Sequence, residues 1–321
     1  MQIEVIRNIV TTRLLALGLE KILLPFDTPL TSPHLPILVS HDIAYAKRVV
    51  VLFYEHTQDL GIIAHRVIGG QGGINSGSAI NFVSYIQSQK DPKGLAPGII
   101  LANTGQLRWH RASKRALTQT SWFSLPSPSA VSPPLRFNPA KNTIPQNANT
   151  TEHISYIFNA VIPRLVNPSA SISLIGVSES AYQLSLFIDD FTNFPTWSQR
   201  ITSFASLGTY FHSSDIKNAA FADWFEKKGR AYIVSSEPSG TFLAGPRGRK
   251  KVEAHGCPVF SLGEPYYSEM LLVRGYKAVL DWMAEVGYDR GYENPKLERL
   301  DFGGEGDDEE AEEVGWIGEG G

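Results

Sequence analysis

One short segment of this sequence has the spacing of a nucleophilic catalytic site. Residues 176–180 read Gly-Val-Ser-Glu-Ser, which fits the pattern G-x-S-x-G except that Ser180 replaces the last glycine. An apolar run at 171–175 precedes the segment, and a helical pattern from about 179 to 188 follows it. A strand that turns sharply into a helix at a G-x-S-x-G segment is the nucleophile elbow of α/β-hydrolases. The segment therefore predicts that Ser178 is exposed as a nucleophile at the end of a buried strand.

A serine nucleophile also needs a base that takes its proton and a carboxylate that orients the base. In α/β-hydrolases the chain order is serine, acid, histidine, each beyond the end of a strand. Glu237 follows the strand-like run 232–236 and fits the acid, but residues 263–270, after the run 258–262, contain no histidine. His212, which follows the run 201–207, is the candidate for a displaced base. His56, after the strand-like run 48–54, and Glu179 are predicted to line the oxyanion pocket.

Two functions remain open on this evidence. Loss of one member of a catalytic triad commonly costs many orders of magnitude in turnover. The first expectation is therefore a hydrolase-shaped protein with weak or no hydrolysis. The alternative is a serine esterase that uses Ser178, His212 and Glu237.

The elements that must position these residues alternate between strands and helices. Residues 48–54 and 98–102 are apolar without alternation, which is typical of strands buried on both faces of a parallel sheet. Helical periodicity recurs at 6–17, 78–89 and 154–165, where Pro163 should kink the helix. The order predicts an α/β fold of the α/β-hydrolase type, with a mostly parallel central sheet and helices on both faces.

Composition supports one large domain with an acidic tail. The chain has 321 residues and is 42% hydrophobic, which is enough for a sizeable core. We expect residues 1–290 to form the domain, with a proline-rich insertion at 124–149 and a disordered tail at 291–321. The net charge of −3 hides an asymmetry, because nine acids and no lysine or arginine lie in 301–321 and residues 1–300 carry +6. The single cysteine and scattered histidines predict neither a disulfide nor a metal site, and no cofactor is expected.

A basic segment at 108–115 is a candidate for nucleic-acid binding. It places four bases and one aromatic residue within eight positions, and such residues can pair with phosphates and stack on a base. A solvated surface loop explains the same composition. The candidate residues are Arg108, Trp109, Arg111, Lys114 and Arg115.

From about residue 14 to residue 286 the chain resembles the Argonaute-binding (Arb-type) domain family. This family occurs in the fungal Argonaute siRNA chaperone and in the C-terminal domain of fungal class II histone deacetylases. The segments that carry the resemblance are 55–61 (EHTQDLG), 64–66 (AHR), 72–77 (GGINSG), 102–107 (ANTGQL), 176–180 (GVSES), 235–238 (SSEP) and 261–263 (SLG) with 268–269 (SE).

The resemblance implies an α/β-hydrolase-like fold and a nuclear location, with the cytoplasm left open as a second location. No apolar run approaches the ~18 residues of a membrane span, so no membrane association is expected. It implies a role in small-RNA-directed heterochromatin formation, that is RNA interference, or in histone deacetylase complexes. The partners would be Argonaute, histone or deacetylase proteins, with siRNA binding as a further possibility. Animal-type members resemble this chain except that a His-Glu pair stands where this sequence has Ser268-Glu269. The resemblance therefore points to a pseudoenzyme.

Overall fold

The computed structural model describes residues 2–126, 129, 131, 135–208, 212–243, 255–289 and 291–294. Of the predicted tail at 291–321, residues 295–321 lie outside these ranges, as does part of the proline-rich insertion. Residues 291–294 are described, and Asn294 is buried and donates to the carbonyls of Glu226 and Gly229. Within the rest of that insertion, α6 (Pro139–Asn142) forms and Ile144 is fully buried, so this segment packs on the domain.

An eight-stranded sheet forms the centre of the domain, with strands in the order β1-β2-β4-β3-β7-β8-β9-β10. β1 and β2 pair antiparallel, β2 pairs antiparallel with β4, and the other neighbours are parallel. This confirms the predicted mostly parallel sheet. The strands are β1 (Leu19–Leu24), β2 (Leu35–Ser40), β3 (Arg48–Phe53), β4 (Gly98–Leu101), β7 (Ser171–Val177), β8 (Ile201–Leu207), β9 (Gly229–Ile233) and β10 (Val259–Ser261).

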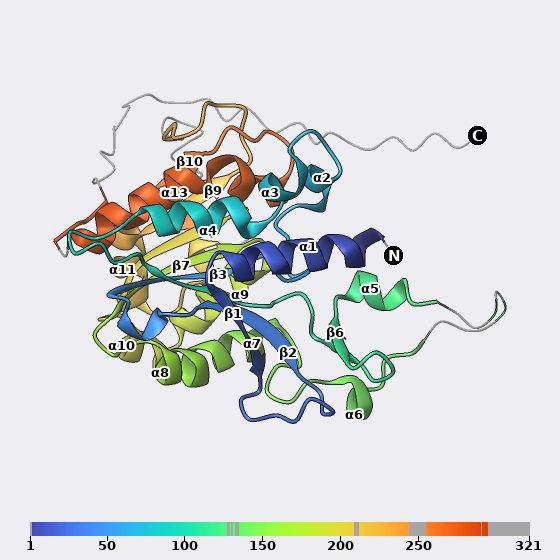
Figure 1. The fold of residues 1–321 in the computed structure, drawn as a ribbon. Coiled ribbons are helices and arrows are strands. Elements are labelled where there is room, and N and C mark those ends of the chain that lie inside the picture. Colours follow the sequence, from blue (N-terminus) through green and yellow to red (C-terminus); the bar gives the residue numbers. More distant parts are fainter. Residues whose placement is uncertain are drawn as a thin grey trace.

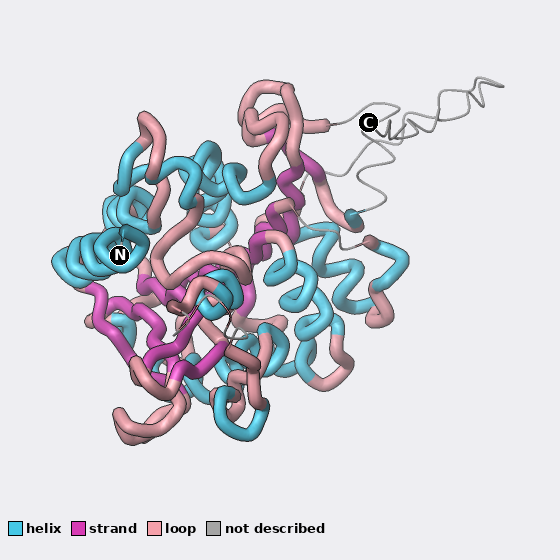
Figure 2. Tube along the Cα trace, turned by 90° about the vertical axis from the view of Figure 1, so that its right-hand side faces the viewer, coloured by secondary structure: helices cyan, strands magenta, loops and turns pink. Residues whose placement is uncertain are grey.

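Helices cover both faces of the sheet (Figure 1). Seen from the side, the strands form a band between two layers of helices (Figure 2). One layer contains α1 (Gln2–Ala16), α2 (His65–Ile68), α3 (Gly73–Ser76), α4 (Ala79–Ser88) and α13 (Leu271–Tyr288). The other contains α7 (Thr150–Tyr156), η2 (Ile157–Val161), α8 (Ile162–Leu165), α9 (Glu179–Asp189), α10 (Asn193–Trp197) and α11 (Ala219–Lys228).

The core consists of two apolar clusters, one on each face of the sheet. Along β3, Val49, Val51 and Phe53 belong to one cluster, whereas Val50 and Leu52 belong to the other. Successive side chains of a strand point to opposite faces, so an apolar run without alternation fills both clusters. This explains why β3 is apolar at every position after Arg48.

Pro163 lies in a helical segment whose hydrogen-bond pattern changes just before the proline. The helical segment from 150 to 165 is interrupted by the π-helical turn η2, which ends two residues before Pro163. Proline has no N–H to donate to the carbonyl four residues earlier, and a π turn shifts the hydrogen-bond pattern by one residue. The helix therefore continues past the proline.

A small antiparallel hairpin lies beside the main sheet. It consists of β5 (Arg108–His110) and β6 (Arg115–Leu117), followed by α5 (Gln119–Phe123). Figure 1 shows α5, α6 and this hairpin on one side of the domain. Three short 3-10 turns complete the described elements: η1 (Ile43–Tyr45), η3 (Ser213–Asp215) and η4 (Ser268–Met270).

Candidate functional site

Ser178 has the backbone geometry of a nucleophile elbow. β7 ends at Val177, α9 begins at Glu179, and Ser178 between them has φ 49° and ψ −123°. This positive φ is disfavoured for serine and costs about 1–3 kcal/mol. The Ser178 amide donates to the carbonyl of Leu207 in β8 at 2.8 Å, which holds the strained residue at the edge of the sheet.

Small residues allow β7 and α9 to meet at this turn. A Cβ added to Gly176 would lie 2.6 Å from the Cα of Ala181, so any side chain there collides with helix backbone. Ser180, which replaces the last glycine of the pattern, is fully buried, and its hydroxyl donates to the carbonyl of Tyr54 at 2.6 Å. The same carbonyl accepts from the hydroxyl of Thr104 at 2.7 Å. Serine is therefore accommodated at position 180 because its hydroxyl has a buried acceptor.

The side chain that faces the nucleophile is another serine. Ser178 Oγ lies 3.5 Å from Ser268 Oγ, the first residue of η4, which follows the last strand of the sheet. Ser268 is packed against the end of β8, since a Cβ on Gly208 would come within 2.6 Å of the Ser268 Cβ. A hydroxyl is a hydrogen-bond partner but not a base at neutral pH. The contact therefore places no proton acceptor beside Ser178.

The two predicted triad partners have other contacts. His212 is exposed, and its Nδ1 lies 2.8 Å from Ser214 Oγ and accepts from the Ser214 amide at 3.3 Å. This histidine therefore caps η3. Glu237 is exposed, and its carbonyl accepts from the hydroxyl of Ser261 at 2.6 Å. Among the hydrogen bonds between described residues, none links His212 or Glu237 to Ser178.

His56 and Glu179 lie close enough to interact electrostatically. His56 Nδ1 is 2.9 Å from Glu55 Oε1. That hydrogen bond raises the pKa of His56, and the charges of Glu55 and Glu179 raise it further. The Glu179 carboxylate also accepts from Gln183 Nε2 at 2.7 Å. The elbow therefore has acidic groups and a histidine on its β3 side.

Sequence reasoning missed Glu264, a buried carboxylate in the loop before Ser268. It is 3% exposed, and its Oε1 accepts from the amides of Tyr266 and Tyr267 at 3.0 and 3.1 Å. Its Oε2 lies 3.5 Å from Arg274 Nε in α13. Glu264 fixes the loop that brings Ser268 to the elbow. The sequence feature that could have identified Glu264 is its position directly after Gly263, just beyond the end of a buried strand.

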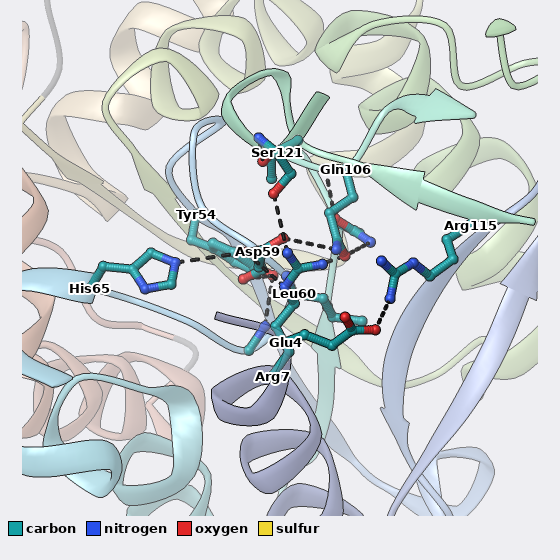
Figure 3. Close-up of polar contacts among 12 residues, drawn as sticks. Glu4, Arg7, Tyr54, Asp59, Leu60, His65, Gln106, Arg115 and Ser121 are labelled. Atoms are coloured by element: carbon teal, nitrogen blue, oxygen red, sulfur yellow. Dashed lines mark hydrogen bonds and ion pairs between the residues drawn. The ribbon is translucent and has the colours of Figure 1, made fainter. Parts of the chain in front are cut away.

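A second missed group surrounds Asp59, in the loop after β3 (Figure 3). The Asp59 carboxylate is 3.2 Å from Arg7 Nε of α1 and 3.7 Å from His65 Nε2, and it accepts from Gln106 Nε2 at 3.0 Å. Three segments of the Arb-type resemblance, at 55–61, 64–66 and 102–107, therefore meet at one buried acid. They hold the loop after β3 and the helix α1 together.

The basic segment at 108–115 forms the hairpin described above. Trp109 is 2% exposed and packs against His34 with ring centroids 4.7 Å apart, so it is not available to stack on a base. Arg115 pairs with Glu4 of α1. Arg108 donates to Gln119 at 3.1 Å. Arg111 and Lys114, at the turn, are exposed.

Within the described ranges there is no group of three or more His, Cys, Asp or Glu side chains that could hold a metal ion. In the same residues, no helix is long and apolar enough to span a membrane.

The order of the eight strands, with the elbow after β7, defines the α/β-hydrolase fold, and this confirms the predicted fold class. A family model of the Arb2 domain matches residues 1–239, about three-quarters of the chain. The chain therefore belongs to the Arb2 domain family, as the sequence motifs indicate. The match includes the elbow and Glu237 but ends before Ser268.

Several solved structures similar to this chain are esterases. An esterase of Pyrococcus furiosus is 7% identical with a TM-score of 0.42, over 84% of this chain and 92% of that one. An arylesterase is 12% identical with a TM-score of 0.37, over 87% and 92%. The esterase Est22 is 11% identical with a TM-score of 0.39, over 89% and 88%. A search of curated protein sequences gave no match.

Proposed function

We propose that this chain is a non-catalytic module of the hydrolase fold that acts by binding. It functions in the nucleus, in small-RNA-directed heterochromatin formation and histone deacetylase-associated gene silencing. Its partners are Argonaute proteins, histones or siRNA. Membership of the Arb2 domain family supports this assignment, because the resemblance in the sequence motifs implies those partners.

The observation that carries the non-catalytic part of the proposal is the contact between Ser178 Oγ and Ser268 Oγ at 3.5 Å. A serine nucleophile in acyl transfer needs a general base, most often an imidazole, at hydrogen-bond distance. Here the neighbouring group is a hydroxyl, and His212 caps a short helix instead. Without the base, turnover falls by several orders of magnitude.

Charge supports a binding role. Residues 1–300 carry +6, and Arg111 and Lys114 are exposed at the turn of the β5–β6 hairpin. Cations that project from a turn can contact the phosphates of an RNA backbone without reading its sequence. This part of the proposal uses Arg111 and Lys114 and leaves out Trp109, which is buried.

The competing function is a serine esterase that uses Ser178, His212 and Glu237. A fluorophosphonate probe distinguishes the two, because it labels only activated serines. We expect no labelling of the full chain, and the same result for Ser178→Ala. Rapid labelling that disappears in both Ser178→Ala and His212→Gln would establish the esterase and overturn the proposal.

Partner binding is tested with the full, tagged chain in nuclear extract, followed by mass spectrometry. We expect recovery of Argonaute, histones or a histone deacetylase, and recovery of only cytosolic metabolic enzymes would contradict the proposal.

Binding to a short RNA duplex is measured at several salt concentrations. If Arg111 and Lys114 contact phosphates, the double variant Arg111→Gln/Lys114→Gln weakens binding and reduces the salt dependence, whereas Lys21→Gln, on an exposed position of β1, does not.

A further inference from the structure

A cavity of about 910 Å³ lies at the edge of the sheet opposite the elbow. It is lined by the residues at the amino ends of four parallel strands, β3, β4, β7 and β8, and by the carboxyl end of α13. Ser178 follows the other end of β7, and a strand of seven residues is about 20 Å long. This amino-edge cavity is therefore separate from the candidate site.

Positive charge predominates in the amino-edge cavity. Four cations and two carboxylates line it: Lys47, Arg48, Arg200, Lys228, Asp91 and Asp289. Only one ion pair joins these lining groups in the described structure, between Lys47 and Asp91 at 3.2 Å. Trp224 and Tyr288 add aromatic surface to the wall. A volume of this size is typical of sites for small organic ligands.

Arg48 is the least compensated of these groups. It is 5% exposed, and its Nη2 donates to the neutral side chain of Gln89 at 2.9 Å. Its Nε and Nη1 are buried without a hydrogen-bond partner, and no described carboxylate lies within 4 Å of the guanidinium. The nearest aromatic ring is that of Tyr288, with its centroid 5.8 Å from Cζ.

An uncompensated guanidinium of this kind destabilises the fold unless a negative charge is bound nearby. Guanidinium keeps its proton at neutral pH, so it cannot escape the cost of burial by becoming neutral. An anion in the adjacent cavity would compensate the charge across a few ångströms of protein, where electrostatic interactions are stronger than in water. The side chains that line the cavity carry a formal charge of +2, which matches a dianion.

We propose that the amino-edge cavity binds a phosphomonoester, with Arg48, Arg200 and Lys228 surrounding the phosphate and Trp224 and Tyr288 contacting its organic group. A phosphomonoester carries close to two negative charges at neutral pH and has three acceptor oxygens. Arginine is well suited to such a group because its planar donors match the geometry of phosphate. This site goes beyond the proposed function and does not use Ser178.

The proposal is tested by calorimetric titration of the full chain with inorganic phosphate and with phenyl phosphate. Sodium chloride at the same ionic strength is the reference, since it reports on screening alone. We expect saturable binding of both probes, tighter for phenyl phosphate because of the aromatic wall. Absence of saturable binding by either probe would overturn the proposal.

Variants locate the site. Removing one positive charge near the phosphate raises the dissociation constant about tenfold, so we expect this from Arg48→Met and Lys228→Gln. Lys114→Gln, on the β5–β6 turn, and Ser178→Ala should bind as the parent does. If Arg48→Met does not fold, Lys228→Gln and Arg200→Gln, from which the same tenfold loss is expected, decide the question. Unchanged binding in the folded cavity variants, or a loss in Ser178→Ala, would place the anion elsewhere and refute the site.

Discussion

His153 provides a stability measurement that depends directly on the contacts of one buried ring. The side chain is fully buried beneath the loop at 102–107. Its Nε2 accepts from the amide of Asn103 at 3.0 Å, so that nitrogen carries no proton. Its Nδ1 therefore carries the proton and donates to Asn147 Oδ1 at 2.7 Å. Burial lowers the pKa of His153 from 6.5 to about 3, because a charged ring at this position would have no solvent.

The sign of the pH dependence follows from this neutral ring. In the unfolded chain the histidine takes up a proton as the pH falls below its ordinary pKa, whereas in the folded chain it does not. Its contribution to stability is complete above pH 6.5 and is lost progressively as the pH falls toward the folded value. With these two pKa values, the free energy of unfolding drops by about 2 kcal/mol between about pH 7.5 and about pH 5.

The variant His153→Gln removes this drop while keeping one donor and one acceptor at the site. Urea unfolding of the parent and the variant at both pH values gives the two pH dependences, and groups common to both proteins cancel. We expect the variant to lose about 2 kcal/mol less than the parent on acidification. His41→Gln is the control, because His41 is an exposed residue on the surface. An equal drop in parent and His153→Gln would show that the ring is not buried in the neutral state.

Three further predictions concern the elbow and its support. Gly176→Ala should lower the free energy of unfolding by about 2–3 kcal/mol in urea titrations, because the new Cβ meets the Ala181 backbone. Asp59→Ala should cost about 3 kcal/mol by leaving Arg7 without its carboxylate, and Arg7→Ala/Asp59→Ala should cost less than the sum of the single changes. Ser268→His should make fluorophosphonate labelling of Ser178 detectable, since it supplies a base, and a variant that stays unlabelled like the parent would contradict the assignment of this position.

The fold was predictable because its signals are local. β3 reads as a strand buried on both faces because apolar side chains fill both clusters. Gly176 and Ser178 mark the elbow because the close approach of β7 and α9 excludes larger residues at position 176. In each case the feature that shapes the structure lies within a few residues of its sequence signal.

The site was less predictable because its contacts are distant in sequence. Ser268 meets Ser178 across 90 residues, and only the absence of a histidine after the last strand hinted at that contact. Trp109 is next to exposed cations in the sequence, yet the β5–β6 pairing turns it inward against His34. Each strand of this hairpin has only three residues, which is too short an alternation to show from sequence which side chains face inward.

The geometry of the elbow does not depend on catalysis. The Ser178 amide is bonded to β8 through Leu207, and the Ser180 hydroxyl is bonded to the carbonyl of Tyr54 beyond β3. These bonds join α9 to two strands of the sheet, so they stabilise the fold whether or not a base is present. A serine in place of the histidine leaves all of them intact. The strained serine at position 178 therefore persists as a structural junction, and a nucleophile elbow by itself is not evidence of hydrolase activity.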